Sequence, residues 1–187
     1  MSGLLHSIRD EYTRYKAMAE AAMAQLRDDE LGTADPSVSN SVSVIVWHLS
    51  GNLGSRFTDF LTTDGEKPWR GREEEFTRRS VSRAELMAKW EAGWRILFDA
   101  LDHLAEADLS RTVMIRGTPF LVHEALHRSL AHASYHVGQI VYIAKHARSE
   151  AWHYLTIPPG RSETYNRDAS CERPDAHAAS LKPADGS

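Results

Sequence analysis

Four long segments of this 187-residue chain repeat their apolar residues at the spacing of an α-helix. They span residues 4–26, 41–61, 82–104 and 119–147. In the third segment Ser82 and Glu85 form a capping box, which is typical of a helix start. The run VSVIV in the second segment is also compatible with a strand, but its length and the apolar spacing that continues to Phe60 favour a helix. We therefore expect an all-α fold in which the four helices form a four-helix bundle.

The connections between these segments differ in length and chemistry. A charged loop is expected over 27–37, and a short hairpin over 111–120, where β-branched residues flank an Arg-Gly turn. The stretch 62–81, TTDGEKPWRGREEEFTRRSV, is too long for a simple turn and too rich in aromatic and charged residues for a flexible linker. It is expected to cover part of the bundle. The sequence predicts one domain over 1–167 and a disordered tail over 168–187, because the tail is small and polar.

Charge and cysteine content narrow the class of partner. Lys and Arg number 22 against 26 for Asp and Glu, so nothing in the net charge of -4 indicates nucleic acid or an anionic membrane. A small-molecule substrate is expected instead. The only cysteine, Cys171, cannot form an internal disulfide, which fits a reducing compartment. The N-terminus meets charge within nine residues and no apolar run approaches the roughly 20 residues of a membrane span, so a cytoplasmic protein is expected.

Two histidine pairs in the fourth segment have the same four-residue spacing. In LAHASYHVGQ, over 130–139, His132 and His136 can reach one point from a single helix face. His123 and His127 could do the same. On a helical wheel with His123 at zero, the core residues fall at about 260° to 340°, and His132 and His136 at about 180° and 220°. We expect this second pair to point inward, and His123 and His127 to lie on a boundary or surface face.

A third histidine, His48, lies within the apolar stretch IVWHLSGN of the second segment, and a bundle can place it opposite His132 and His136. Inward imidazoles need partners, because burying a polar group without one is costly. Separate hydrogen bonds to hydroxyls or carbonyls are one solution, and a shared metal is another. Three neutral imidazoles without a thiolate suit zinc, nickel or iron, and three protein ligands leave one position for water or substrate.

Three stretches together resemble a DinB-like (YfiT/DinB superfamily) branch of bacterial proteins. They are WHLSGNLGSRFTDFLTTDGEKPWRGREEEF, HASYHVGQIVYIAKH and LTIPPGRS, and the similarity covers about residues 4–167. The resemblance implies a four-helix bundle, commonly a homodimer, with a metal held by one histidine of the second helix and an HxxxH pair of the last bundle helix. These positions correspond to His48, His132 and His136.

Characterised proteins of that superfamily include bacillithiol S-transferases, mycothiol-dependent isomerases and proteins described as metal-dependent hydrolases. The resemblance implies a metal site and an enzyme, without fixing the reaction. We expect a metal-dependent S-transferase or related enzyme that uses a low-molecular-weight thiol, with zinc or nickel as the divalent metal. The thiol would occupy the open metal position, and no side chain stands out as a catalytic nucleophile. A hydrolase is the first alternative, and Glu124 is its nearest candidate base. The second is a non-enzymatic dimeric bundle whose metal has a fourth protein ligand.

Two polar side chains lie close in sequence to the histidines. Asn52 is one helical turn beyond His48, and Gln139 is one turn beyond Tyr135. Each is a candidate for a hydrogen bond that orients a metal-binding imidazole. A hydrogen bond between packed helices explains either residue equally well.

Basic and aromatic residues form the candidate substrate site. Lys67, Trp69 and Arg70, followed by Arg72, lie in the long loop and could bind the carboxylates of a thiol cosubstrate if that loop covers the metal. A solvated loop is the alternative. Arg56 is a further candidate, although an ion pair with Asp59, three residues on, also accounts for it.

Overall fold

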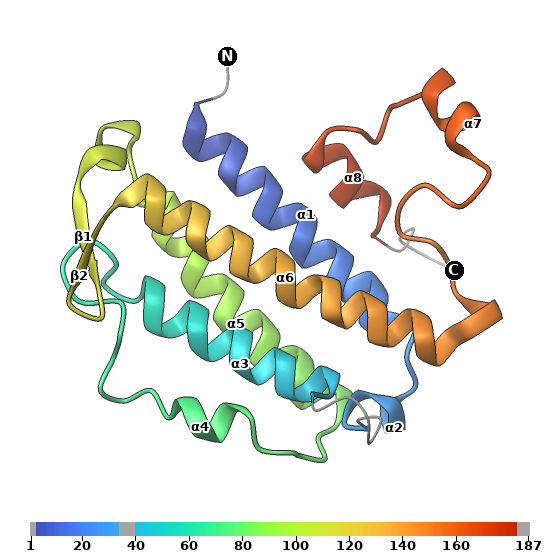
Figure 1. Ribbon diagram of the computed structural model, residues 1–187, viewed down its shortest axis with the longest axis horizontal. Helices are drawn as coiled ribbons and strands as arrows, with labels where there is room; N and C mark the ends of the chain where they lie inside the picture. The colour runs from blue at the N-terminus through green and yellow to red at the C-terminus, as the bar shows by residue number, and fades with distance from the viewer. Residues whose placement is uncertain (1–2, 34–39, 183–187) are drawn as a thin grey trace.

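The computed structural model describes residues 3–33 and 40–182, and its fold is mostly helical. The four long helices are α1 (Leu4–Ala24), α3 (Val42–Phe57), α5 (Arg83–Asp102) and α6 (Val122–Arg148). They lie side by side as two closely packed pairs, α1 against α6 and α3 against α5 (Figure 1). Contacts of α3 with α6 and of α1 with α5 join the two pairs. The predicted all-α class is confirmed.

The run VSVIV, residues 42–46, lies in the first turns of α3 and does not form a strand. Residues 42–46 are all buried, so this turn of the helix is covered on every side, and apolar residues carry no periodicity there. The Ser41 hydroxyl accepts a hydrogen bond from Val44 N and caps the helix. In α5, the predicted capping box between Ser82 and Glu85 is present. None of the helices within the described residues combines the length and the apolar character needed to cross a bilayer.

Shorter elements lie between the long helices and after the last of them. They are α2 (Asp28–Leu31), α4 (Arg72–Glu75), the 3-10 helices η1 (Glu106–Ser110) and η2 (Ser149–Ala151), α7 (Ser162–Arg167) and α8 (Pro174–Ser180). The predicted hairpin is present as antiparallel strands β1 (Thr112–Ile115) and β2 (Thr118–Leu121). Arg116 and Gly117 form its turn with positive φ angles of 53° and 71°. The expected charged loop over 27–37 contains α2, and its residues from 34 onward lie outside the described residues.

The long segment 62–81 crosses from the hairpin to α4, which packs alongside α3 (Figure 1). The Asp64 carboxylate accepts hydrogen bonds from Arg116 N at 2.8 Å and Gly117 N at 2.7 Å. Gly65 N donates to the Met114 carbonyl at 2.8 Å, and Arg116 forms an ion pair with Glu66. The loop is therefore fastened to the hairpin turn at one end and to α3 at the other.

The predicted disorder of the tail over 168–187 is wrong for the helix α8, which packs against α1. Ala178 is buried, and the His177 ring lies 2.7 Å from the Leu155 carbonyl oxygen, to which its Nε2 donates. The prediction missed this helix because a seven-residue segment needs only two buried side chains to dock, and small polar residues surround them. Residues 183–187 of the tail lie outside the described residues, and the domain boundary at 167 stays a prediction.

Candidate metal centre

The helices α3 and α6 bring His48, His132 and His136 to one point, as their positions in the sequence predict. His48 Nε2 lies 3.3 Å from His132 Nε2, and His136 Nε2 lies 3.2 Å from the same atom. One possible ligand atom from each residue falls within 4.8 Å of the other two. His48 and His136 are buried and His132 is half-buried. The predicted convergence of the three imidazoles is confirmed.

Hydrogen bonds at the far side of two rings decide which nitrogen carries the proton. His48 Nδ1 donates to Glu75 Oε2 at 2.9 Å, and a carboxylate can only accept. His136 Nδ1 donates to Gln139 Oε1 at 2.8 Å. In their neutral forms both rings therefore present a bare lone pair at Nε2, which is the tautomer that binds a metal through Nε2.

Hydrogen bonds among the three histidines cannot pair all of their ring nitrogens, because of His132. Its Nδ1 is buried and has no hydrogen-bond partner among the described residues, while its Nε2 faces two acceptor nitrogens. A neutral imidazole has one N–H, so at least one of the two lone pairs opposite stays unpaired. A cation at the centre would satisfy all three. Two nitrogens about 2.1 Å from a tetrahedral metal lie about 3.4 Å apart. The observed separations of 3.2 and 3.3 Å fit that geometry.

The surroundings keep His132 and His136 in the neutral form that ligation requires. Burial, assisted by the charges of His136, His48, Arg70 and Arg56, lowers the pKa of His132 to about 3. Burial also lowers the pKa of His136, against the opposing effect of its hydrogen bond with Gln139. Both rings are therefore uncharged at neutral pH.

Glu75, which sequence reasoning missed, holds His48 in place from α4. Its carboxylate is buried and accepts two further hydrogen bonds at 2.8 Å from Arg70, one on each oxygen. Burial acts to raise the pKa of Glu75, but the hydrogen bonds from His48 and Arg70 outweigh it and the pKa is lowered. A carboxylate behind a ligating histidine fixes the ring and raises its basicity.

The sequence feature that matches the position of Glu75 is Gly51, where the Glu75 carboxylate comes close to the backbone of α3. A Cβ atom at Gly51 would lie 2.1 Å from Glu75 Oε1, so only glycine leaves room for the carboxylate one turn after His48. The sequence places three glutamates in a row at 73–75, and nothing in it indicates which one faces α3. Phe76 completes this wall by packing on the His48 ring, with the ring centroids 4.7 Å apart.

The other predicted site residues divide into two groups. Gln139 makes the imidazole hydrogen bond proposed for it, whereas the corresponding bond to His48 comes from Glu75 and not from Asn52. Asn52, Arg56 and Arg70 line a pocket that reaches His48 and His132.

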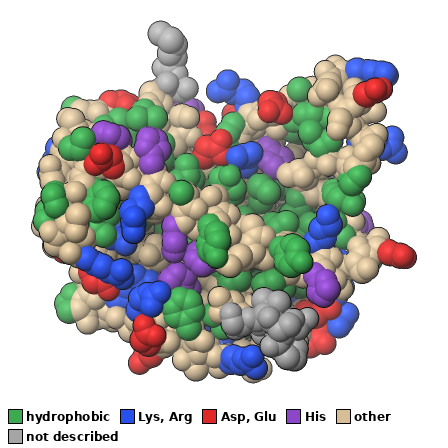
Figure 2. All heavy atoms as spheres, viewed as in Figure 1, with side chains coloured by type: hydrophobic (Ala, Val, Ile, Leu, Met, Phe, Trp, Pro, Cys, Tyr) green, Lys and Arg blue, Asp and Glu red, His purple; other side chains and the backbone are tan. Residues whose placement is uncertain are grey.

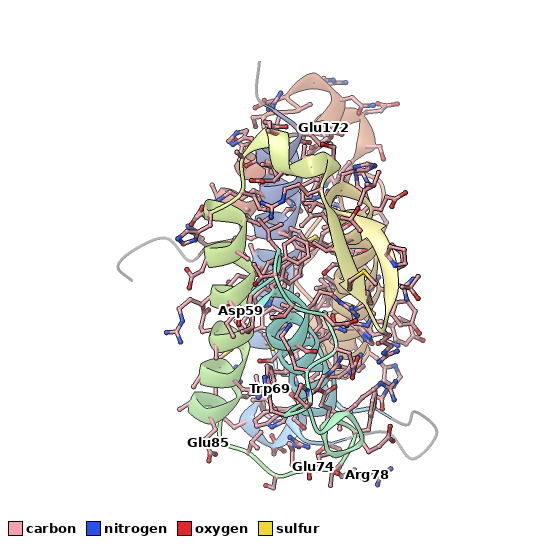
Figure 3. All side chains as sticks on the ribbon, turned by 90° about the vertical axis from the view of Figure 1, so that its left-hand side faces the viewer. Asp59, Trp69, Glu74, Arg78, Glu85 and Glu172 are labelled. Carbon is pink, nitrogen blue, oxygen red and sulfur yellow. The ribbon has the colours of Figure 1, made fainter. Side chains whose placement is uncertain are left out.

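The remaining two candidates lie away from that pocket. Lys67 is buried and donates to the Asp64 carbonyl. Trp69 is 60% exposed and packs against α3 at Gly54 (Figure 3). Among the described residues Arg56 forms no ion pair with Asp59.

The pocket beside the cluster has a volume of about 490 Å³ and is strongly basic. Five arginines line it, and its lining contains no carboxylate and no cysteine. Figure 2 shows Lys and Arg side chains gathered next to histidines toward the hairpin end of the molecule. A larger pocket of about 760 Å³ lies between Arg14 of α1 and residues 154–181. None of the three histidines lines it, so the smaller pocket is the functional candidate.

The fold and the cluster define a helical protein with a three-histidine site at the contact of two helices. The chain belongs to the family described as a protein of unknown function (DUF1572), whose model matches residues 2–161. That match covers the long helices and all three histidines. No curated protein and no solved structure matches the chain.

Proposed function

We propose that the protein is a metal-dependent enzyme of the DinB-like type, in which His48, His132 and His136 bind a divalent zinc or nickel ion. The observation that supports this most directly is that Nε2 of His132 lies 3.3 Å from Nε2 of His48 and 3.2 Å from Nε2 of His136. Hydrogen bonds at Nδ1 leave the Nε2 atoms of His48 and His136 as lone pairs. We also propose that α1, α3, α5 and α6 correspond to the four-helix bundle of that superfamily.

The residues around the cluster have separate roles in this proposal. Glu75 and Gln139 hold His48 and His136 with Nε2 toward the metal, and Arg70 holds Glu75 in turn. Three protein ligands leave a position open, and His48 and His132 line the pocket on that side. When bound, the metal would supply a Lewis acid that favours the thiolate form of a thiol substrate.

The reaction that we propose is S-transfer from a low-molecular-weight thiol. The thiol loses its proton to solvent, its sulfur forms a bond to an electrophilic carbon, and the leaving group departs with its bonding electrons. This reaction needs neither a protein nucleophile nor a protein base, which agrees with a pocket lining that contains no cysteine and no carboxylate.

Two alternatives have less support. A hydrolase of the thermolysin kind needs a carboxylate base near the metal, but both oxygens of Glu75 are engaged by Arg70 and His48. Glu124 accepts a hydrogen bond from Leu121 N and caps the start of α6. A purely structural metal site needs a fourth protein ligand. Among the described residues, the only group of potential ligands contains the three histidines alone.

The test combines metal analysis with a screen for activity. Purified protein is analysed for zinc, nickel and iron, then incubated with bacillithiol, mycothiol, glutathione or cysteine and a chromogenic electrophile. A nitrophenyl ester is assayed in parallel. We expect bound metal and thiol-dependent product that both disappear in His48→Ala. Protein that binds no metal after reconstitution would overturn the proposal, and metal-dependent ester cleavage without thiol transfer would favour the hydrolase.

A further inference from the structure

Five arginines surround the pocket beside the histidine cluster, and their charges are unevenly compensated. Three form ion pairs with acidic residues: Arg70 with Glu75, Arg116 with Glu66, and Arg72 with Glu73. The other two, Arg56 of α3 and Arg128 of α6, form no ion pair within residues 3–33 and 40–182. The pocket therefore carries excess positive charge on two facing helices.

Arg56 is the most unusual of these side chains because it is a buried cation that forms no ion pair within the described part of the chain. Only 8% of its surface is exposed, and its buried Nη1 has no hydrogen-bond partner among the described residues. Burial lowers its pKa, and the charges of Arg70, Arg116 and Arg128 lower it further, against a smaller opposing effect of Glu66. A buried charge left unpaired is strongly unfavourable, so such a group calls for a functional explanation.

The loop backbone holds the Arg56 guanidinium in this position. A Cβ atom at Gly65 would lie 2.7 Å from Arg56 Nη1, so the loop passes directly over the side chain. The Ser55 hydroxyl donates to the Gly65 carbonyl at 2.7 Å and fixes that approach. The side chain is thus constrained by its surroundings, although no described acidic group forms an ion pair with it.

A second helix supplies further donors to the same pocket. Arg128 and the buried Ser129 of α6 line it together with His132, one turn further along the helix. The pocket joins these donors to the metal-binding face, because His48 and His132 belong to its lining. A ligand held by Arg56 and Arg128 would therefore lie beside the open side of the three-histidine cluster.

We propose that this pocket is a binding site for the oxyanion of a small substrate, a carboxylate or a phosphate, held by Arg56 and Arg128. Guanidinium groups present paired N–H donors that match both oxyanions. The volume of about 490 Å³ fits a small molecule. This inference deepens the proposed function by naming the charge of the substrate. It rests on that function only for the reaction of the substrate at the metal, since anion binding itself needs no metal.

The first experiment measures anion binding in the full chain after metal has been removed with a chelator. Inorganic phosphate and succinate are titrated separately by calorimetry at low ionic strength, with sodium chloride as the control for non-specific screening. We expect at least one of the two to bind. The affinity should fall at least about tenfold in Arg56→Met and in Arg128→Met, since each removes a charged hydrogen bond. Arg95→Met, which removes an exposed arginine of α5 outside the pocket, should bind like the wild type.

A second variant separates loss of the site from loss of the fold. Arg56→Lys keeps the charge but not the paired donors, so it should bind more weakly than the wild type and more tightly than Arg56→Met. Thermal melting establishes that each variant is folded. Binding of phosphate but not succinate would assign a phosphate ligand, and the reverse would assign a carboxylate.

The outcomes also separate this inference from the proposed metal function. Arg56→Met should retain the metal content of the wild type after reconstitution. If the protein binds no metal but still binds phosphate or succinate through Arg56, only the proposed function fails. If neither anion binds, or if binding requires metal and ignores Arg56→Met, the oxyanion site is overturned.

Discussion

The helix α6 carries two histidine pairs with identical spacing, and they meet different surroundings. His132 and His136 have ring centroids 4.6 Å apart, and both rings pack against His48 of α3. The ring centroids of His123 and His127 are 6.3 Å apart. His123 Nδ1 donates to the Leu109 carbonyl at 3.0 Å, and His127 is exposed.

The comparison shows that the four-residue spacing is necessary for a shared point but does not create one. His132 and His136, the inner pair, become a candidate site because a second helix supplies His48. Hydrogen bonds to Glu75 and Gln139 also fix Nδ1 of His48 and of His136. In the outer pair, His123 and His127, a hydrogen bond to Leu109 holds His123, but among the described residues no third ligand joins the two rings. Helical phase, which places one pair toward α3 and the other toward solvent, is therefore the deciding variable.

The largest effect should come from removing either member of the inner pair. In His132→Ala or His136→Ala, bound zinc should fall from about one equivalent per chain to background, since two imidazoles hold the metal poorly. Mass-spectrometric metal analysis of reconstituted protein measures this. His127→Ala is the matched control on the same helix. Full metal occupancy in both inner variants would refute the assignment of the site.

A smaller loss is expected from Glu75→Gln, which keeps the shape of the side chain but removes its charge. Metal affinity should fall about 10- to 100-fold, because the carboxylate fixes and polarises His48. Competition with a coloured chelator gives the affinity.

The matched control is Glu74→Gln, one residue earlier on α4, which is exposed at the edge of the molecule (Figure 3). Equal losses in the two variants would mean that Glu75 acts only through the charge of the α4 surface.

Stability should depend on pH through the inner pair. His132 has a pKa of about 3 in the folded chain, against an ordinary value near 6.5. Between these values the unfolded chain binds a proton that the folded chain does not, so the stability present above about pH 6.5 is lost as the pH falls toward 3. The melting temperature of chelator-treated protein should decline over that range, and less so in His132→Ala.

The same series of melting temperatures against pH is repeated with excess zinc. The metal competes with protons for the imidazoles, so zinc should raise the melting temperature at neutral pH and move the acid-induced decline to lower pH. Coincident curves with and without zinc at neutral pH would leave an ordinary cluster of core histidines.

The smallest effect is expected for the outer pair. His127→Ala should keep its metal content and melt within about 2 °C of the wild type, because surface substitutions rarely cost more than about 0.5 kcal/mol. The double variant His123→Ala, His127→Ala should also keep its metal content and melt a few degrees lower, since it loses the hydrogen bond from His123 to Leu109 as well. Loss of metal would show that the helical phase assigned to α6 is wrong.

The parts of the fold that sequence reasoning found are those governed by local rules. The four long helices begin and end within a few residues of their predicted bounds because apolar spacing and the Ser82 cap are properties of neighbouring residues. His48 could also be found, since a histidine inside an apolar helix requires a partner. The hairpin follows from its Arg-Gly turn.

The parts that sequence reasoning missed depend on contacts between distant segments. Glu75 lies 27 residues from His48, and its role depends on how the long loop returns to α3. Arg128 of α6 and Arg56 of α3 line the same pocket, and no pattern among neighbouring residues in the sequence indicates this. The helix α8 packs against α1 and buries only two side chains, His177 and Ala178, which is too little for a periodic apolar pattern.

The anchoring of segment 62–81 at both ends bears on how a family such as this can vary. Long surface loops usually tolerate insertions and deletions. Here the Asp64 carboxylate is bonded to the hairpin turn and Glu75 to His48, so a residue added between them would shift one anchor against the other. The spacing of eleven positions from Asp64 to Glu75 thus fixes where Glu75 meets His48, and with it the orientation of the His48 ring. Chains that keep this length should keep the three-histidine geometry, and insertions should accumulate after Phe76, where the backbone leaves α4.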